Sequence, residues 1–354
     1  FMINFDEYIQ QGEPGRKEKA QAWQTAIGLQ DVDGLKVSSY LIESARKHIE
    51  GEMSIDEVRR DLKEYYETKS THDDQSAEQE EADCVSSNIV KLLNEKTFSF
   101  SLAGLMAIHR RVFEGVFKFA GQLRTVNITK KEWVLEGDTV RYVSADEIRQ
   151  TIEYDMSQEK QVDYTQLSME AAILQLAKFT SGIWQIHPFR EGNTRTTAVF
   201  VIKYLRSMGF NVTNDLFAEK SWYFRNALVR ANYQNIPKGI AYDNSFLVLF
   251  FRNLILGEQN ELHNRDMHIS RIGLKSARAE VPKSKICTLN CTLEESAVLR
   301  CIEDNPKITQ KDIATAIGKS ERTVKKITSC LVEKGILIRV NGRRNGWWQI
   351  KCGQ

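Results

Sequence analysis

The stretch of sequence that decides the fold is His187-Pro188-Phe189-Arg190-Glu191-Gly192-Asn193-Thr194-Arg195. An apolar helical pattern precedes it, and a strongly helical run, residues 196–207, follows it. Proline disfavours helical geometry in the residue before it, so His187 is expected in a loop. A loop that leads into a helix presents unpaired N–H groups and the positive end of the helix dipole. The stretch therefore predicts an anion-binding site at a helix N-terminus.

Three side chains of this stretch add matching chemistry. Arg195 supplies a positive charge that suits a phosphate group. Glu191 offers oxygen ligands of the kind that hold Mg²⁺ beside nucleotide phosphates, and His187 is a base whose charge changes near neutral pH. Each residue alone could be a hydrogen-bonded loop histidine or a surface charge. Their order and spacing together indicate a nucleotide-phosphate and metal site.

The spacing of apolar residues over residues 1–70 predicts a small helical unit. Residues 38–50 place apolar side chains at helical spacing, and Gly51 ends this helix. Ser54 followed by Glu57 forms a capping box for the next one. The polar, acidic residues 68–83 are read as a linker or a solvated helix start.

Residues 71–260 contain long helical patterns with one interruption. Two β-rich runs, residues 125–129 and 139–143, flank the turn sequence Glu136-Gly137-Asp138. This arrangement predicts a β-hairpin. Helical patterns resume at about residue 145 and again over residues 168–185.

A basic, polar linker is expected over residues 261–285, followed by a new pattern over residues 286–354. Three predicted helices (residues 293–303, 310–317 and 321–334) and two strand-like runs (336–340 and 347–351) are typical of a winged helix-turn-helix domain. Residues 292–351 hold 12 Lys and Arg against 7 Asp and Glu, which makes DNA a candidate partner. Protein contacts or dimerisation are the alternative use of this domain. The candidate DNA contacts are Arg322, Lys325, Lys326, Arg343 and Arg344.

The overall composition is that of an ordinary globular protein. The chain has 354 residues, of which 42% are hydrophobic, and a net charge of +2, so the whole molecule has no general attraction to nucleic acid or membranes. No apolar run approaches the roughly 20 residues of a membrane span, and no signal peptide is visible, so a cytoplasmic location is expected. The six cysteines lack zinc-site spacing and are expected to be free thiols.

The stretch that begins at His187 resembles the Fic family signature, H-P-F-x-[D/E]-G-N-G-R-x-x-R, and the resemblance extends over residues 85–257. It implies a mainly α fold, with an all-helical core and a β-hairpin flap, and transfer of AMP from ATP to a Ser, Thr or Tyr hydroxyl of a target protein. His187 would deprotonate that hydroxyl, Phe189 would anchor the loop, and Glu191 would hold Mg²⁺. The phosphates would be bound by Gly192, Asn193, Thr194 and Arg195.

The resemblance also assigns residues outside the signature. Tyr223 and Asn226 match positions near the adenine, although an aromatic residue there equally suits helix packing. The hairpin occupies the position of the family's flap, which holds the target segment by strand addition. The candidate docking residues on it are Lys130, Lys131 and Glu132, with plain solvated turn charges as the alternative.

Two positions depart from the signature: Thr194 replaces its second glycine, and Ala198 replaces its final arginine. In the family that arginine binds the γ-phosphate, and in inhibited members it also pairs with a regulatory glutamate. Residues 44–51 resemble the antitoxin partners of Fic toxins, so Glu50 and, in a second register, Glu43 are the inhibitory candidates; a solvated helix-end glutamate is the alternative. Since Ala198 cannot pair with a glutamate, we expect glutamate-based autoinhibition to be weak or absent, and the N-terminal unit to act as a structural clamp.

The sequence thus predicts a protein adenylyltransferase that uses ATP and Mg²⁺, modifies a target protein or itself, and contacts DNA through its winged helix. Two alternatives stay open: a nucleotide-sensing DNA-binding regulator whose Fic domain has little or no activity, and transfer from another phosphate-containing donor. His187 favours the enzyme, because a sensor needs no base. A homodimer is compatible with the sequence.

Overall fold

The computed structural model describes residues 5–68, 74–210, 212, 215–271, 291–341 and 346–351. The chain divides into two compact units, Phe1–Glu159 with Ala177–Leu274, and Lys160–Leu176 with Lys275–Gln354. Helices dominate the described parts of both units, which confirms the predicted fold class. Among the described residues, none of the helices combines the length and apolar content that crossing a bilayer requires.

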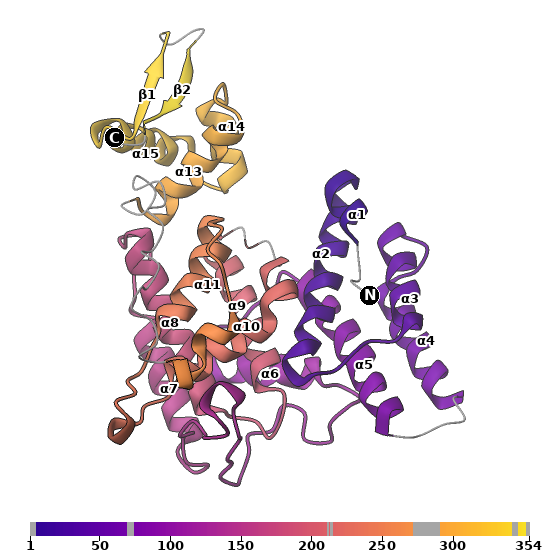
Figure 1. Cartoon of the computed structure of the whole chain (residues 1–354). Helices are drawn as coiled ribbons and strands as arrows, with labels where there is room; N and C mark the ends of the chain where they lie inside the picture. Colours follow the sequence, from indigo (N-terminus) through magenta and orange to yellow (C-terminus); the bar gives the residue numbers. More distant parts are fainter. Residues whose placement is uncertain are drawn as a thin grey trace. The chain divides into compact units, whose positions relative to one another are not determined.

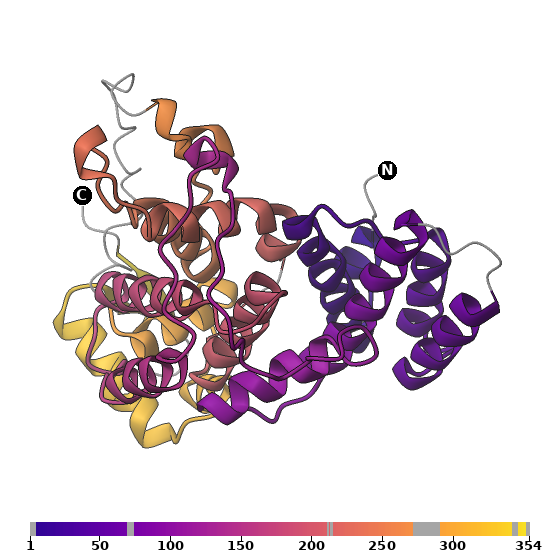
Figure 2. The same cartoon turned by 90° about the horizontal axis from the view of Figure 1, so that it is seen from below.

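The first unit begins with helices that pack on α5 (Asp74–Asn94) or on one another. They are α1 (Asp6–Gln11), α2 (Pro14–Gly28), the 3₁₀ helix η1 (Leu29–Asp33), α3 (Ser39–Glu50) and α4 (Ile55–Thr68). Both α2 and α4 contact α5, and α2 also contacts α10 (Asp215–Ala231). Figure 2 shows the indigo and purple N-terminal helices gathered side by side. These contacts bury Trp23 completely and attach the N-terminal helices to the rest of the unit.

The predicted ends of the N-terminal helices are confirmed. The Ser38 hydroxyl accepts a hydrogen bond from the Leu41 N–H at 3.1 Å, and Gly51 ends α3 with a φ of 88°. Ser54 and Glu57 form the reciprocal capping box at 2.7 and 3.2 Å. Each bond satisfies a helix-end N–H that has no partner within its own helix.

A buried carboxylate joins three of these helices. Asp83 on α5 is fully buried, and it accepts hydrogen bonds from the Ser38 N–H at 2.9 Å and the Tyr66 hydroxyl at 2.7 Å. Asp83 lies in the acidic stretch read from the sequence as a linker or a helix start. The structure makes this stretch helical from Asp74 onward, and residues 69–73 lie outside the described part.

The centre of the first unit is α9 (Asn193–Ser207), whose residues 193–205 are all buried. It contacts α5 and α6 (Leu102–Val112). The other helices of this part are α7 (Ile148–Glu159), the end of α8 (Met169–Ile186), α10, α11 (Ser245–Leu256) and the 3₁₀ helices η2 (Trp133–Leu135), η3 (Ile236–Lys238), η4 (Asn264–Met267) and η5 (Ile269–Arg271). Burial on all sides fixes the start of α9, where the candidate site lies.

The segment of residues 125–143, called the flap below, reverses direction as predicted, but the predicted β-hairpin is wrong. No β-strand is formed within it; its tip tightens into η2, closed by a 2.9 Å hydrogen bond from the Glu132 N–H to the Asp138 carbonyl. The Lys130 N–H meets the Thr139 hydroxyl instead of a carbonyl. The Arg124 guanidinium donates to the carbonyls of Val126 and Val143, so a side chain joins the two legs.

The second unit contains the predicted winged helix. Its elements are α13 (Leu293–Asp304), α14 (Gln310–Ile317), α15 (Glu321–Glu333), β1 (Leu337–Val340) and β2 (Trp347–Ile350). The strands pair antiparallel, with Leu337 opposite Ile350 and Val340 opposite Trp347 (Figure 1). Val298, Ile313, Val324 and Leu337 belong to one buried core, so the three helices and the hairpin form a single packed structure.

Candidate active site

The backbone of His187 is held in an unusual conformation directly after α8. Its φ is 51°, in the left-handed region that residues other than glycine rarely adopt. The His187 N–H donates to the Trp184 carbonyl at 3.0 Å, and the carbonyl of His187 accepts from Arg124 Nε at 2.7 Å. Because Arg124 is itself 2% exposed, this strained turn is fixed from inside the protein.

The His187 ring presents one free nitrogen. Its Nδ1 lies 3.3 Å from the Trp184 carbonyl, an acceptor, so Nδ1 carries the proton and Nε2 keeps its lone pair. Among the described residues nothing hydrogen-bonds to Nε2, although the residue is only 3% exposed. Burial, together with the nearby Lys130 ammonium, holds the pKa of His187 well below its usual value. The ring is therefore a neutral base at neutral pH.

A buried ion pair supports this ring from the flap. Tyr142 lies against the ring with centroids 4.2 Å apart, and its hydroxyl reaches Glu132 Oε1 at 3.4 Å. Glu132 is fully buried and pairs with Arg225 of α10 at 2.9 Å. The Glu132 carboxylate faces the interior, where Arg225 and Tyr142 bind it. Lys131 is exposed, and the docking roles of both residues stay predictions.

The loop after His187 is locked by its own side chains. The Asn193 side-chain oxygen accepts a hydrogen bond from the Phe189 N–H at 2.9 Å, and its Nδ2 donates one to the Phe189 carbonyl at 2.8 Å. Phe189 stacks on His109, with centroids 3.8 Å apart, and His109 Nε2 meets the Glu191 carbonyl at 3.1 Å. Gly192 has a φ of 73°, and a Cβ there would lie 2.1 Å from Phe113. A side chain at this glycine would therefore force Phe113 or the loop to shift.

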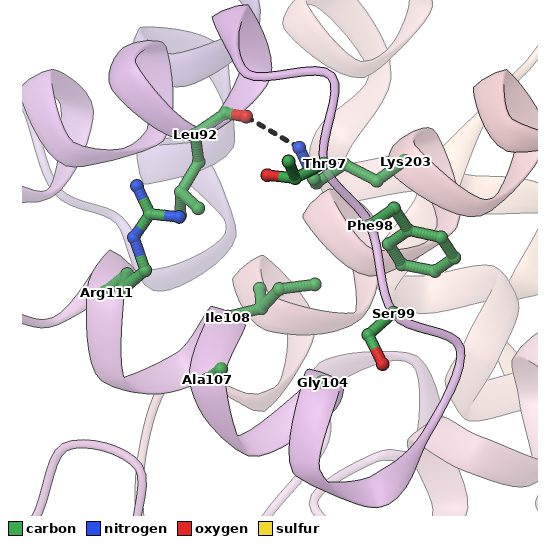
Figure 3. Close-up of a pocket in the computed structure, with 9 residues that line it drawn as sticks. All are labelled: Leu92, Thr97, Phe98, Ser99, Gly104, Ala107, Ile108, Arg111 and Lys203. Atoms are coloured by element: carbon green, nitrogen blue, oxygen red, sulfur yellow. Dashed lines mark hydrogen bonds between the residues drawn. The ribbon is translucent and has the colours of Figure 1, made fainter.

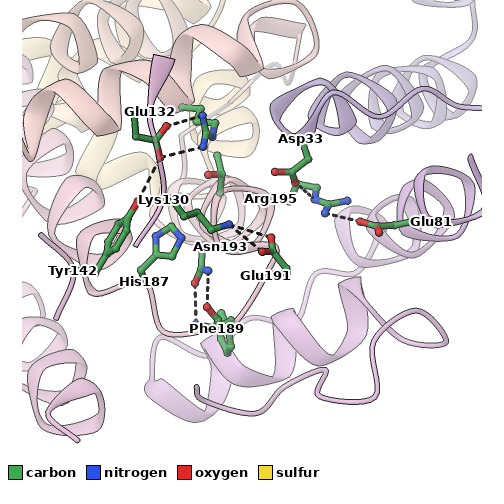
Figure 4. A network of polar contacts seen from close by, with 12 residues as sticks. Asp33, Glu81, Lys130, Glu132, Tyr142, His187, Phe189, Glu191, Asn193 and Arg195 are labelled. Carbon is green, nitrogen blue, oxygen red and sulfur yellow. Dashed lines mark hydrogen bonds and ion pairs between the residues drawn. The ribbon is translucent and has the colours of Figure 1, made fainter. Parts of the chain in front are cut away.

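The Glu191 carboxylate is bound by the flap. Lys130 Nζ lies 3.2 Å from Oε1 and 3.1 Å from Oε2, and both side chains are partly exposed (Figure 4). An exposed pair of this kind contributes about 0–1 kcal/mol, so either partner is readily exchanged. Lys130 thus pairs with a residue of the motif, and its role in docking a target segment stays a prediction.

Arg195 lies in a different environment from the one predicted. Its guanidinium contacts Asp33 at 2.8 Å and Glu81 at 2.7 Å (Figure 4). It donates a hydrogen bond to Gln30 at 2.9 Å. It also stacks on Phe113 at 4.8 Å and is 2% exposed. Two carboxylates oppose one cation, so this cluster carries a formal charge of −1, and the side chain is bound by the N-terminal helices. The phosphate role of Arg195 stays a prediction.

The two positions that depart from the signature are both buried. The Thr194 hydroxyl accepts from Trp184 Nε1 at 3.0 Å, which ties the start of α9 to the end of α8. Its backbone N–H still belongs to the first turn of α9, where amides have no intrahelical acceptor. Ala198 is fully buried and brings no charge.

The adenine candidates Tyr223 and Asn226 are interior residues. Tyr223 is 2% exposed, and its hydroxyl donates to the Phe246 carbonyl at 3.2 Å. The Asn226 amide donates to Asn264 at 2.8 Å, while its Oδ1 has no hydrogen-bond donor among the described residues. The position of Tyr223 agrees with the helix-packing alternative.

The two inhibitory candidates on α3, Glu43 and Glu50, bind side chains outside the motif of residues 187–195. Glu50 accepts a hydrogen bond from the Tyr8 hydroxyl, and Glu43 pairs with Lys47 at 3.2 Å. Both contacts are exposed. The carboxylates that pair with Arg195 of the motif belong instead to Asp33 on η1 and Glu81 on α5. No local pattern in the sequence had indicated these two residues.

In the winged helix, α15 carries three of the DNA candidates. Arg322, Lys325 and Lys326 are exposed, and their spacing places them on one face of the helix. Arg343 and Arg344 lie outside the described residues.

A pocket of about 260 Å³ lies elsewhere in the first unit, between the end of α5, residues 97–99 and α6 (Figure 3). Its buried cation is Lys203, whose Nζ donates to the carbonyls of Leu92 at 2.8 Å and Glu95 at 2.7 Å. Burial lowers the pKa of Lys203 to about 8. None of residues 187–195 lines this pocket. Lys203 instead donates hydrogen bonds to carbonyls at the C-terminal end of α5, which lack partners within that helix.

The residues around the motif are similar to a known family. Residues 99–205 match the Fic/DOC family. This part of the chain is therefore similar to Fic/DOC domains. Residues 295–338 match the winged helix-turn-helix DNA-binding family, which agrees with the fold of the second unit.

Two relatives share the Fic domain. The probable protein adenylyltransferase y4lH of Sinorhizobium fredii is 31% identical over 126 residues, which cover 35% of this chain and 62% of that protein. Protein adenylyltransferase VbhT of Bartonella schoenbuchensis is 26% identical over 160 residues, which cover 44% of this chain and 29% of that protein. The matched part of this chain thus spans less than two thirds of the length of either relative.

Solved Fic structures are also similar. A Fic family protein from Desulfovibrio desulfuricans G20 covers 98% of this chain and 91% of its own, with 12% identity and a TM-score of 0.46. The N-terminal Fic domain of the Bep8 protein from Bartonella sp. 1-1C covers 52% of this chain and 88% of its own, with 19% identity and a TM-score of 0.41.

Proposed function

We propose that this protein is an adenylyltransferase that moves AMP from ATP to a Ser, Thr or Tyr hydroxyl of a protein, itself or another. The observation that carries the proposal is the free, buried Nε2 of His187 beside the start of α9. A buried nitrogen without a partner is costly, and a base held in this way is typical of a catalytic site. The names of the two relatives support the same activity.

The reaction follows from the site's own groups. His187 Nε2 takes the proton of the target hydroxyl while that oxygen attacks the α-phosphorus of ATP. The new O–P bond forms as the bond from the α-phosphorus to its bridging oxygen breaks, and pyrophosphate leaves. The first-turn amides of α9 at Asn193 and Thr194, with the N–H of Gly192, stabilise the phosphate charge.

Glu191 is the residue that would hold Mg²⁺. The described residues contain no group of three or more His, Cys, Asp or Glu that could hold a metal ion. A single carboxylate nevertheless fits Mg²⁺, which commonly takes one or two protein carboxylates and completes its ligands with substrate phosphates and water. When bound, the ion neutralises negative charge on the phosphates. Lys130 must leave the Glu191 carboxylate for this to occur.

Intact-mass analysis tests the proposal. The full chain is incubated with ATP and Mg²⁺, alone and with lysate proteins, beside a His187→Ala variant. A gain of one AMP per modified molecule that requires His187 is the expected result. If wild-type protein binds ATP but no AMP is ever transferred, the nucleotide-sensing alternative replaces this proposal.

We further propose that the winged helix binds DNA through α15. The supporting observations are the family match of residues 295–338 and the exposed face that carries Arg322, Lys325 and Lys326. Cations on such a face contact phosphates and favour binding without specifying sequence.

A salt titration tests this second proposal. Binding of the full chain to duplex DNA should weaken with salt, and alanine at Arg322 or Lys325 should reduce the logarithmic salt slope by about one. Alanine at Lys311, an exposed lysine on α14, is the comparison variant. Undetectable or salt-insensitive binding would leave protein contacts as the use of this domain.

A further inference from the structure

The phosphate site of this protein lacks two of the charges that ATP needs. Ala198 is buried and uncharged where the signature has an arginine. Arg195 lies in an ion pair with Asp33 and donates hydrogen bonds to Glu81 and Gln30, and the two carboxylates outweigh its charge. A triphosphate placed at the start of α9 would therefore meet a cluster that is negative in sum, so another cation has to balance its β- and γ-phosphates.

Lys130 is the cation whose surroundings allow this. Of the charged neighbours of His187, Arg124 is bound to backbone carbonyls, and Arg225 is bound to a fully buried glutamate. Removing either from its partner would leave a buried group unpaired, which is expensive. Lys130 instead pairs with Glu191 at 3.1 Å where both side chains are partly exposed, so its contact is weak and exchangeable.

We propose that Lys130 of the flap is a nucleotide-binding residue, which gives up Glu191 and binds a β- or γ-phosphate oxygen of ATP. This inference rests on the proposed function, because it places ATP at the start of α9. The exchange has two consequences that fit together. The Glu191 carboxylate becomes free as a ligand, and the charge missing at Ala198 is supplied from the flap. Figure 4 shows the Lys130 side chain reaching from the flap toward Glu191.

The role differs from that of a target-docking residue. A docking lysine on the flap would affect the protein substrate and leave nucleotide binding unchanged. A phosphate-binding lysine discriminates among nucleotides: ATP and ADP carry a β-phosphate, and AMP does not. The contrast between ATP and AMP therefore separates the two roles without any transfer assay.

Calorimetry on the full chain tests the inference. ATP and AMP are titrated in EDTA into wild-type protein and into the variants Lys130→Met and Lys130→Arg. The matched control is Lys131→Met, because Lys131 is the neighbouring lysine and is exposed. We expect Lys130→Met to weaken ATP binding about tenfold, the size for one hydrogen bond between charged groups, and to change AMP binding little. Lys130→Arg and Lys131→Met should bind ATP nearly as wild type does. Equal melting temperatures establish that each variant is folded.

Every other outcome decides against Lys130. If Lys130→Met binds ATP as tightly as wild type, Lys130 is not a nucleotide ligand, while His187-dependent AMP transfer still supports the proposed function. Equal weakening of ATP and AMP would mean that the variant disturbs the flap as a whole. If wild-type protein binds neither nucleotide, with or without Mg²⁺, both this inference and the proposed function are wrong.

Discussion

Replacing Gly192 by alanine should destabilise the first unit through two separable effects. The first is conformational: Gly192 has a φ of 73°, and a left-handed residue with a Cβ costs about 1–2 kcal/mol. The second is steric, because the new Cβ would lie 2.1 Å from Cζ and 2.2 Å from Cε2 of Phe113. Phe113 cannot move aside easily, since it is fully buried between Arg195 and His109. Forcing an extra carbon into such a site costs about 1–3 kcal/mol more.

Gly209, at the other end of α9, provides a matched control. Its φ is 86°, but a Cβ there would have no atom within 4 Å, so Gly209→Ala has the conformational cost alone. The difference between the variants should be about 1–3 kcal/mol, or about 2–12 °C in melting temperature for a unit of this size. Differential scanning calorimetry of the full chain measures it. Equal melting temperatures for the two variants would refute the argument from Phe113, and strain would then account for the whole effect.

Two further predictions concern buried charge. The pKa values of His48 and His109 are lowered to about 4, chiefly by burial, so the unfolded chain binds more protons below about pH 6.5. The melting temperature should therefore fall as the pH is lowered from 6.5 toward 4; a flat or rising curve would contradict this. Asp33→Asn removes the carboxylate 2.8 Å from buried Arg195 and should lower the free energy of unfolding by about 1.5–3 kcal/mol in urea denaturation. Glu43→Gln, in an exposed pair, should change it by about 0.5 kcal/mol or less, and equal effects would count against a structural role for the Arg195 cluster.

Local signals predicted the helices and the motif loop well. Ser38, Gly51 and the pair Ser54 and Glu57 act within a few residues of themselves, so their pattern alone indicates where helices begin and end. The winged helix was predictable for the same reason, because its caps and turns are short. Pro188 likewise placed His187 in a loop from sequence alone.

Contacts between distant segments were not predictable from the sequence. Arg195 is separated in the sequence from Glu81 by 114 residues and from Gln30 by 165, and no local pattern indicates that these residues pair. Glu132 sits in a polar turn sequence, yet it is buried because Arg225, 93 residues away, neutralises it. The β-hairpin was predicted from β-rich runs, but no strands form in the flap, and Arg124 binds a carbonyl on each leg. In each case an arginine side chain takes part in the contact.

The position of Arg124 also limits how the flap can evolve or be engineered. The Arg124 guanidinium donates hydrogen bonds to the carbonyls of His187, Val126 and Val143, so one side chain positions both His187 and the two legs of the flap. A flap transplanted from a relative would have to present carbonyls at the same two places. A graft that failed to do so would loosen the backbone of His187 along with the flap.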